Sequence, residues 1–395
     1  MPSQFRRRGN YRRRYFAPSN RKPNNDLMWA ITAGRSLNAK AEVQTKPDYV
    51  PEHKFEDFPI SPQIKRNIAN KKYISPTPIQ DKAIPVILSG KDIIGIANTG
   101  TGKTAAFLVP LIEKIEKDKT QKVLIVAPTR ELALQISDQL EDFSRSMNIA
   151  SAICIGGTSL GRQRSDLLQN PAFVIGTPGR IKDFINQRLL NLSQFNNVVL
   201  DEADRMVDIG FIGDIKYFIS LLPRVRQSLF FSATISKDVR EIIHSFVTNP
   251  TVVSVKETDT VENITQDIVK VGGSEQKVDK LHDLLIQNGF DKVLIFGRTK
   301  RGVQKLTNEL ASRGFKAGVI HGNKTQNQRQ RTLDMFKNNR IRILLATDVA
   351  SRGLDIENVS HVINYDMPAS YDDYIHRIGR TGRANKRGTA LTFVS

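Results

Sequence analysis

Residues 97–104 read ANTGTGKT, and this run is the strongest indication in the sequence of an α/β fold around a phosphate site. It follows the apolar run 93–96 and fits the phosphate-loop pattern G-x-x-x-x-G-K-[ST] in a relaxed form, with alanine in place of the first glycine. A buried strand that enters a turn of small residues before a helix directs backbone N–H groups at bound phosphates. Lys103 is predicted to reach the β- and γ-phosphates, and Thr104 to ligate Mg²⁺. An ordinary glycine-rich turn is the simpler interpretation, but it leaves the terminal Lys-Thr unexplained. The residues predicted to hold a nucleoside triphosphate are Ala97, Asn98, Thr99, Gly100, Thr101, Gly102, Lys103 and Thr104.

The charge of the chain indicates a polyanionic partner. Its 395 residues contain 59 Lys and Arg against 40 Asp and Glu, a net charge of +19, which favours nucleic acid first and an anionic membrane surface second. No apolar run approaches the ~20 residues of a membrane span, and no apolar stretch of a secretory signal follows the Arg-rich start. The single cysteine, Cys154, forms no internal disulfide, and no Cys/His cluster suggests zinc. We expect a soluble, cytoplasmic protein.

Residues 1–50 differ from the rest in composition. They contain 11 Lys and Arg but 3 Asp and Glu, so they carry +8 of the net charge. Such a segment buries too little apolar surface to fold alone, whereas its arginines and aromatics suit phosphates and bases. We predict a disordered RNA-binding tail, with a solubilising or partner-docking tail as the alternative. The short apolar patch 27–31 holds the only Trp. The sequence does not decide whether this patch docks on the rest of the protein as a short helix.

The chain after residue 50 is predicted to contain two copies of one α/β domain, at 51–256 and 262–395. Short Val/Ile/Leu runs alternate with helical stretches, which is typical of βαβ units and a parallel sheet. The run that ends before Thr129 matches the run that ends before Thr299, 170 positions later, and the same apolar helical face follows each. The boundary is expected at 256–261. Buried strands in the first copy are predicted at 92–96, 123–127, 151–155, 172–176, 197–201 and 228–232.

The second copy lacks the phosphate loop. Its run 267–271 leads into 272–277, which is shorter than the loop of the first copy and has no Gly-Lys-Thr. The second domain is therefore expected to complete a site on the first domain, or to bind a polymer.

Two acidic residues follow the strand predicted at 197–201. A triphosphatase needs a carboxylate near its metal and a group that orients water. Asp201 lies at the C-terminal end of that strand, beside the phosphate-loop turn of a parallel sheet. Asp201 is expected to hold Mg²⁺ through water, and Glu202 to position or deprotonate the attacking water. A solvated acidic loop is the alternative.

Together these features resemble the DEAD-box family of RNA-dependent ATPases and helicases, over about residues 55–395. The resemblance implies two tandem RecA-like domains, each a parallel sheet flanked by helices, with ATP and Mg²⁺ as ligands. The name motif is Asp-Glu-Ala-Asp at 201–204. Further matches are PTPIQ at 76–80, PTRELA at 128–133, GG at 156–157, TPGR at 177–180, SAT at 232–234, QNQR at 326–329, ATD through RGLD at 346–355 and HRIGRTGR at 376–383.

The resemblance implies roles around ATP that elementary chemistry supports. Phe55 would stack on adenine and Gln80 would pair with its edge, which favours ATP over GTP. Arg380 and Arg383 would act as arginine fingers from the domain that lacks a loop, worth about 10³–10⁵ in rate. Asp355 would bind the ribose, and Gly353, two residues before it, would belong to the same nucleotide site. Residues that would link the ATP and RNA sites are Ser232, Thr234 and His376.

The resemblance also implies an RNA surface without base-reading elements. Hydroxyls, guanidinium groups and glycine amides at loop and helix starts suit phosphates and sugars, and the 2′-OH distinguishes RNA from DNA. The two domains are therefore expected to bind RNA of any sequence. Their affinity for RNA is expected to fall as the salt concentration rises. The residues implied are Pro128, Thr129, Arg130, Gly157, Thr177, Pro178, Arg180, Arg329 and Thr347.

We therefore expect an ATP-dependent RNA helicase, active as a monomer, that separates short duplexes by closing its domains on single-stranded RNA. An ATP-gated RNA clamp or assembly scaffold uses the same residues and stays open as an alternative, and a processive DNA translocase is more distant. Departures from the family are few: Asn98 replaces Gln, Lys72-Tyr73 replaces Gly-Phe, and Ser351 replaces Ala. Asn98 bears on how RNA binding couples to hydrolysis. The end at Ser395 indicates either no C-terminal tail or a truncated one.

Overall fold

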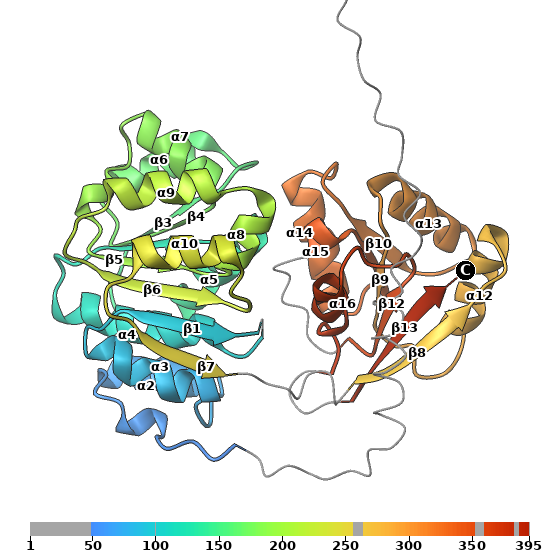
Figure 1. Ribbon diagram of the computed structural model, residues 1–395, viewed down its shortest axis with the longest axis horizontal. Helices are drawn as coiled ribbons and strands as arrows, with labels where there is room; N and C mark the ends of the chain where they lie inside the picture. Colours follow the sequence, from blue (N-terminus) through green and yellow to red (C-terminus); the bar gives the residue numbers. More distant parts are fainter. Residues whose placement is uncertain (1–48, 99, 256–263, 352–358, 383–386, 395) are drawn as a thin grey trace, which may run out of the picture.

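The computed structural model describes residues 49–98, 100–255, 264–351, 359–382 and 387–394. They form two α/β domains that lie side by side (Figure 1). The predicted boundary at 256–261 and nearly all of the predicted tail lie outside the described residues. Within those residues, no helix is long and apolar enough to cross a lipid bilayer.

The first domain is built on one parallel sheet. From one edge to the other its strands run β3-β4-β2-β5-β6-β1-β7. Six of the strands were predicted to within about one residue, and β7, an edge strand with half-exposed residues, was not. The bounds are β1 Ile93–Ala97, β2 Val123–Val126, β3 Ser151–Cys154, β4 Phe173–Gly176, β5 Asn197–Leu200, β6 Gln227–Ser232 and β7 Thr251–Val255.

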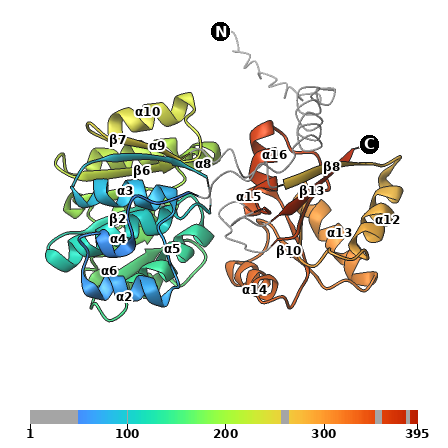
Figure 2. The same cartoon turned by 90° about the horizontal axis from the view of Figure 1, so that it is seen from below.

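Helices cover both faces of this sheet (Figure 2). The set α2 to α5 packs on one face, and α6 to α10 packs on the other. Their bounds are η1 Phe55–Asp57, α2 Pro62–Asn70, α3 Pro78–Leu88, α4 Lys103–Lys117, α5 Arg130–Phe143, α6 Leu160–Leu168, α7 Pro178–Asn186, η2 Leu192–Gln194, α8 Ala203–Ile209, α9 Ile212–Leu221 and α10 Lys237–Phe246.

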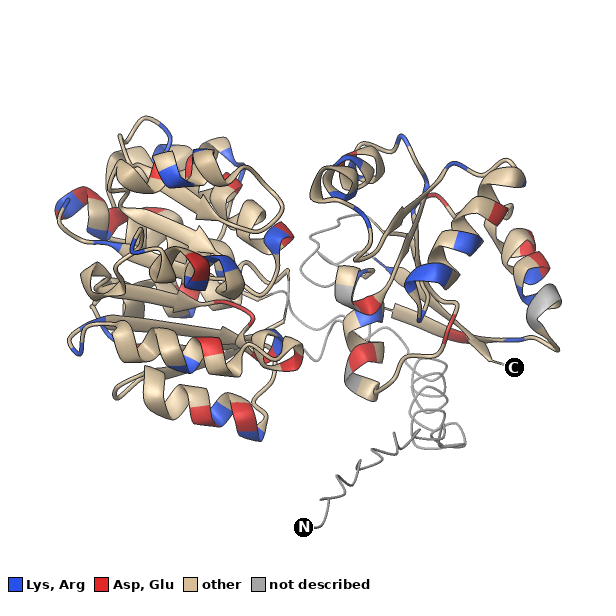
Figure 3. Cartoon of the chain, turned by 90° about the horizontal axis from the view of Figure 1, so that it is seen from above, with Lys and Arg blue, Asp and Glu red and all other residues tan. Residues whose placement is uncertain are grey.

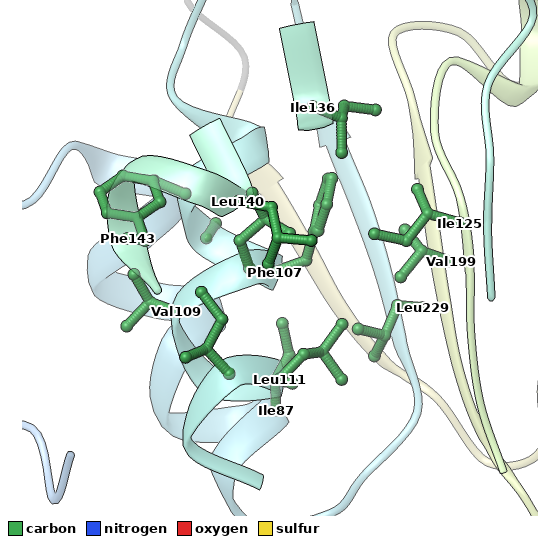
Figure 4. Packing of buried hydrophobic residues seen from close by; sticks show 14 of the residues in the cluster. Ile87, Phe107, Val109, Leu111, Ile125, Ile136, Leu140, Phe143, Val199 and Leu229 are labelled. Carbon is green, nitrogen blue, oxygen red and sulfur yellow. The ribbon is translucent and has the colours of Figure 1, made fainter. Parts of the chain in front are cut away.

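Strand periodicity explains why both faces are apolar. Successive side chains of a strand point to opposite faces, so Val123 and Ile125 of β2 enter one core, and Leu124 and Val126 enter the other. A sheet covered on both faces needs such unbroken apolar runs. Figure 4 shows the first core, in which side chains of α3, α4 and α5 meet those of the sheet, among them Ile87, Phe107, Leu111, Leu140, Ile125, Val199 and Leu229.

The second domain repeats the architecture with six parallel strands, in the order β10-β11-β9-β12-β13-β8. Its strands are β8 Ile264–Lys270, β9 Val293–Phe296, β10 Ala317–Ile320, β11 Ile343–Ala346, β12 His361–Asn364 and β13 Gly388–Val394. Its helices are α12 Ser274–Leu285, α13 Lys300–Ser312, α14 Gln326–Lys337, α15 Asp348–Ser351 and α16 Tyr371–Ile378.

The internal repeat predicted from the sequence is present strand for strand. The order β3-β4-β2-β5-β6-β1 of the first sheet matches β10-β11-β9-β12-β13-β8 of the second, and β7 is the extra strand. The two threonines that define the repeat play the same local role. Thr129 accepts a hydrogen bond from the Leu132 N–H at the start of α5, and Thr299 accepts one from the Gly302 N–H at the start of α13, which satisfies free N–H groups of each first turn.

Candidate active site and nucleic-acid groove

The phosphate loop connects β1 to α4, as expected. Gly102 has a φ of +94°, a left-handed conformation that glycine adopts without strain, just before α4 begins at Lys103. The Lys103 side chain is buried, and its Nζ donates to the Ala97 carbonyl oxygen across the loop at 2.8 Å. The Thr101 hydroxyl donates to the Asn98 carbonyl oxygen at 2.9 Å. Four other residues predicted to belong to this site lie outside the described residues: Thr99, Gly353, Asp355 and Arg383.

Gln80 lies directly against the phosphate loop. Its Oε1 accepts from the Thr77 N–H at 3.0 Å, and its Nε2 donates to the Gly102 carbonyl oxygen at 3.1 Å. A Cβ at position 102 would lie 2.4 Å from that Nε2, so the close approach needs glycine. Phe55, which was predicted to stack on adenine, is 3% exposed and packs on Phe58 and Tyr73, so its ring lies in the core of the first domain and is not open to a base here.

Asp201 and Glu202 lie at the C-terminal end of β5, and both are buried. Burial raises the pKa of Asp201 to about 6, although nearby Lys103 opposes the shift. Burial also opposes ionisation of Glu202, but Arg205, Lys103 and Arg380 outweigh it and lower the pKa of Glu202 to about 2. The two neighbouring carboxylates therefore differ in proton affinity, because only Glu202 has enough cations around it.

Arg205 is a site residue that the sequence reasoning missed. It lies one turn beyond Glu202 on α8, is buried, and forms an ion pair with the Glu202 carboxylate. Glu202 itself has a φ of +50°, which is uncommon for a residue with a Cβ and is typical of positions held by their surroundings. The spacing of three positions on a helix is the signal that could have found this pair.

Asp204 joins the acidic motif to the loop after β6. Its Oδ2 accepts from the Thr234 N–H at 2.9 Å, from the Thr234 hydroxyl at 3.0 Å and from the Ala233 N–H at 3.1 Å. The Ser232 hydroxyl donates a hydrogen bond to the Thr234 carbonyl oxygen at 2.7 Å. The same hydroxyl accepts one from the Asp204 N–H at 3.3 Å. The two motifs thus form one hydrogen-bonded unit.

A pocket of about 350 Å³ is lined by residues of both domains. The first domain supplies Lys103 and Glu202, and the second supplies His376 and the largely buried Arg380. Arg380 is close enough to help lower the pKa of Glu202. Two residues without a predicted role, Asp208 and Asp373, also line it.

A second hollow, of about 550 Å³, collects most of the residues predicted to bind RNA. We call it the groove. Arg130 lies over two glycines of the opposite loop, and a Cβ at Gly157, whose φ is +78°, would lie 2.3 Å from its Nη1. Pro178, which is buried, and Thr347, 7% exposed, do not line the groove. Predicted residues that do line it are Pro128, Thr129, Arg130, Gly157, Thr177, Arg180 and Arg329, and it also contains Gly322, Lys324, Ile209 and Phe211.

The two domains are joined at the groove by Glu131, another residue that was given no role. Its buried Oε1 accepts from Arg329 Nη2 at 2.8 Å and from Gln326 Nε2 at 3.2 Å, both on α14. Arg329 was predicted to bind RNA, and here it also makes this ion pair between domains. Lys and Arg positions are distributed over both domains (Figure 3), so basic charge alone does not locate the groove.

A phosphate-loop domain beside a copy of the same sheet that lacks the loop, with a pocket lined from both, is the arrangement of a helicase core of two RecA-like domains. The chain belongs to the DEAD-box family of ATP-dependent RNA helicases. The family model for DEAD/DEAH box helicases matches residues 77–242, and the model for the helicase conserved C-terminal domain matches residues 276–385. Both the resemblance found in the sequence and the predicted fold class are thereby confirmed.

Individual relatives agree with the family models. The chain is 45% identical over 343 residues to the DEAD-box ATP-dependent RNA helicase CshA of Bacillus licheniformis, which covers 86% of this chain and 70% of that protein. It is 46% identical to the CshA of Listeria monocytogenes, over 86% of this chain and 66% of that protein. Among solved structures, S. cerevisiae Dbp5 bound to RNA and ADP BeF3 matches with a TM-score of 0.76 at 31% identity, over 86% of this chain and 89% of that one.

Proposed function

We propose that this chain is an RNA-dependent ATPase that separates short RNA duplexes locally, or remodels RNA–protein complexes, by closing its two domains on single-stranded RNA. The observation that carries the proposal is that the pocket and the groove are each lined from both domains. A ligand that fills either one favours the domain arrangement that the other ligand needs, so ATP and RNA raise each other's affinity. One chain supplies both halves of both sites, which supports an active monomer, and we place it in the cytoplasm, where ATP and RNA are both present.

The nucleotide is bound by the first domain. Its phosphates lie in the loop at 97–104 against Lys103, and its base lies at the end of α3 near Gln80. Glu202 orients the attacking water. Arg205, Lys103 and Arg380 lower the pKa of Glu202, so it is ionised at neutral pH and can accept a hydrogen bond from that water. Arg380, with Arg383, stabilises charge on the γ-phosphate once the domains close.

Mg²⁺ fits the residues that the first domain offers. Hydroxyl and carboxylate oxygens are ligands that Mg²⁺ prefers, and the raised pKa of Asp201 marks a buried carboxylate short of positive charge. Thr104 would hold the ion directly, and Asp201 through water. The described residues contain no cluster of three His, Cys, Asp or Glu that could hold a metal, so phosphate oxygens and water would complete the ligand set. When bound, the ion neutralises phosphate charge.

The RNA strand lies along the groove, with its phosphates and sugars against hydroxyls, amides and guanidinium groups. Arg130 and Arg180 would contact phosphates, as would Thr129 and Thr177 at helix starts. The hydrogen-bonded unit of Asp204, Ser232 and Thr234, together with His376 in the pocket, would transmit the state of the nucleotide to the groove. No base-reading element is required, so binding tolerates sequence.

Displacement of a strand from a short RNA duplex with Mg²⁺-ATP tests the proposal. The wild-type protein is expected to separate the duplex, and Glu202→Gln is expected to keep ATP-dependent RNA binding while losing turnover. Glu241→Gln is the matched control, because Glu241 pairs with Lys216 on the exposed side of α10. RNA-stimulated hydrolysis and ATP-dependent RNA retention without strand separation would favour the clamp or scaffold instead. Unchanged hydrolysis by Glu202→Gln would contradict the role of Glu202.

A further inference from the structure

The segment 49–53, which we call the strap, is held against helix α3 by one carboxylate. Asp81 of α3 is 2% exposed. It accepts hydrogen bonds from the Tyr49 hydroxyl at 2.5 Å and from the Glu52 N–H at 2.8 Å. It also accepts from the His53 N–H at 3.1 Å and lies 2.7 Å from His53 Nδ1. All four groups come from the strap.

Asp81 links the strap, which precedes Phe55, to the helix that carries Gln80. It follows Gln80, whose side chain binds the Thr77 N–H and the Gly102 carbonyl oxygen of the phosphate loop. The strap in turn ends two residues before Phe55. The carboxylate therefore connects the segment that carries Phe55 to the helix that carries Gln80.

Aromatic packing makes the same connection from the core side. The His53 ring lies 5.6 Å from the ring of Phe58, which lies 6.1 Å from that of Phe55. Phe55 in turn lies 6.4 Å from Tyr73, just before the PTPIQ motif. A shift of the strap would thus move Phe55 as well as the first turn of α3.

The electrostatics favour a strap that stays in place at neutral pH. Burial alone would raise the pKa of Asp81, but hydrogen bonds from Tyr49, Glu52 and His53 hold it below its usual range. Burial and the hydrogen bond to Asp81 raise the pKa of Tyr49 above its usual range. The pair therefore consists of a charged acceptor and a neutral donor, a combination stronger than a neutral pair.

We propose that Tyr49 and His53, acting through Asp81, are positioning residues of the nucleotide site that set its affinity and its preference for adenine. The inference rests on the proposed function, since it needs the adenine of ATP bound beside Gln80. Hydrogen bonds to charged groups are among the stronger ones, and only part of the loss of one reaches the nucleotide, so the expected effects on ATP affinity are a few-fold to about tenfold.

Steady-state kinetics of the full-length chain with saturating RNA test this. Tyr49→Phe, which removes only the hydroxyl, is expected to raise KM for ATP by about threefold, and Asp81→Asn by about tenfold, each with kcat nearly unchanged. KM for GTP, which does not use the positioned Gln80 in the same way, should change less, so the ATP preference falls. Asp142→Asn is the matched control, because Asp142 of α5 is also bonded by two groups, Lys71 and Arg145, neither of which belongs to the strap or to α3.

The outcomes separate the two proposals. Loss of ATP preference in Tyr49→Phe with an unchanged melting temperature supports the positioning role of the strap. If the double variant Tyr49→Phe/Asp81→Asn has nearly the same KM for ATP as Asp81→Asn alone, the two residues act through one contact. Unchanged KM values, or equal changes for ATP and GTP, would overturn it. If the Asp81→Asn variant does not fold, the KM values of Tyr49→Phe for ATP and GTP are sufficient to test the proposal. A wild-type protein without RNA-stimulated ATPase activity would instead overturn the proposed function.

Discussion

Replacement of Asp201 by Asn is expected to stabilise the nucleotide-free protein while it abolishes ATP hydrolysis. Asn keeps an acceptor for the Glu202 N–H, which Asp201 Oδ1 accepts at 3.0 Å, but removes a buried charge. The pKa of Asp201 is about 6 against a usual 3.8, a difference of about 2 units. At ~1.4 kcal/mol per unit, the ionised carboxylate lowers the free energy of unfolding by up to ~3 kcal/mol.

The pH dependence has a definite sign. Because the folded-state pKa is raised, the protonated form stabilises the folded state relative to the ionised one. The loss of folding free energy caused by the Asp201 charge is therefore absent below about pH 4. It grows between pH 4 and pH 6 and reaches its full value above about pH 6. The advantage of Asp201→Asn over wild type should be largest at pH 7.5 and about half as large at pH 5.

Thermal unfolding without nucleotide or Mg²⁺ measures this. At ~2–4 °C per kcal/mol for a domain of this size, the ~3 kcal/mol difference should make the variant melt about 6–12 °C above wild type at pH 7.5. Asp118→Asn is the control of opposite sign, because hydrogen bonds from Thr120 and Gln121 lower the pKa of that exposed carboxyl. A variant that melts at or below wild type at pH 7.5, or whose advantage grows as the pH falls, would refute the reasoning.

Three further predictions concern the domain interface and the tail. Arg380→Ala should lower kcat for RNA-stimulated hydrolysis by about 10³ or more while KM for ATP changes little, as measured by phosphate release; a normal kcat would remove its role as a finger. Glu131→Gln should weaken ATP-dependent RNA binding about tenfold, because it breaks the ion pair with Arg329 between domains; unchanged binding would contradict that role. Deletion of residues 1–48, which lie outside the described structure, should weaken RNA binding and flatten its salt dependence, as measured by titrations between 50 and 200 mM salt; an unchanged slope would exclude an RNA-binding tail.

Most of the fold could be predicted because it follows from local patterns. Buried strands of a parallel sheet are continuous apolar runs, and six of those in the first domain were placed to within about one residue. The repeat centred on Thr129 and Thr299 predicted two copies, and both copies have the same strand order. Strand β7 was not predicted: its run Thr-Val-Val-Ser-Val is interrupted by a serine, and at the sheet edge it buries Val253 while Val252 is exposed.

The site was predictable only where chemistry follows sequence order. The loop, Gln80 and the acidic motif could be predicted because each is marked by a short run of adjacent residues, although Gln80 contacts Gly102 and Asp204 contacts Thr234, both well separated in the chain. The contact of Glu131 with Gln326 joins residues 195 positions apart, and no local pattern encodes that distance. The contact of Tyr49 with Asp81 was missed for the same reason, although it spans only 32 positions.

The central claim is that ATP and RNA together close the two domains. Fluorescence energy transfer between dyes at Leu168→Cys and Ile286→Cys measures it most directly, because these exposed positions lie on different domains. The native Cys154 is buried, and burial raises the pKa of its thiol to about 12, which suppresses labelling there. The account predicts high transfer only with both ATP and RNA, and a return to low transfer after hydrolysis. High transfer with either ligand alone, or hydrolysis stimulated by RNA without any change in transfer, would contradict it.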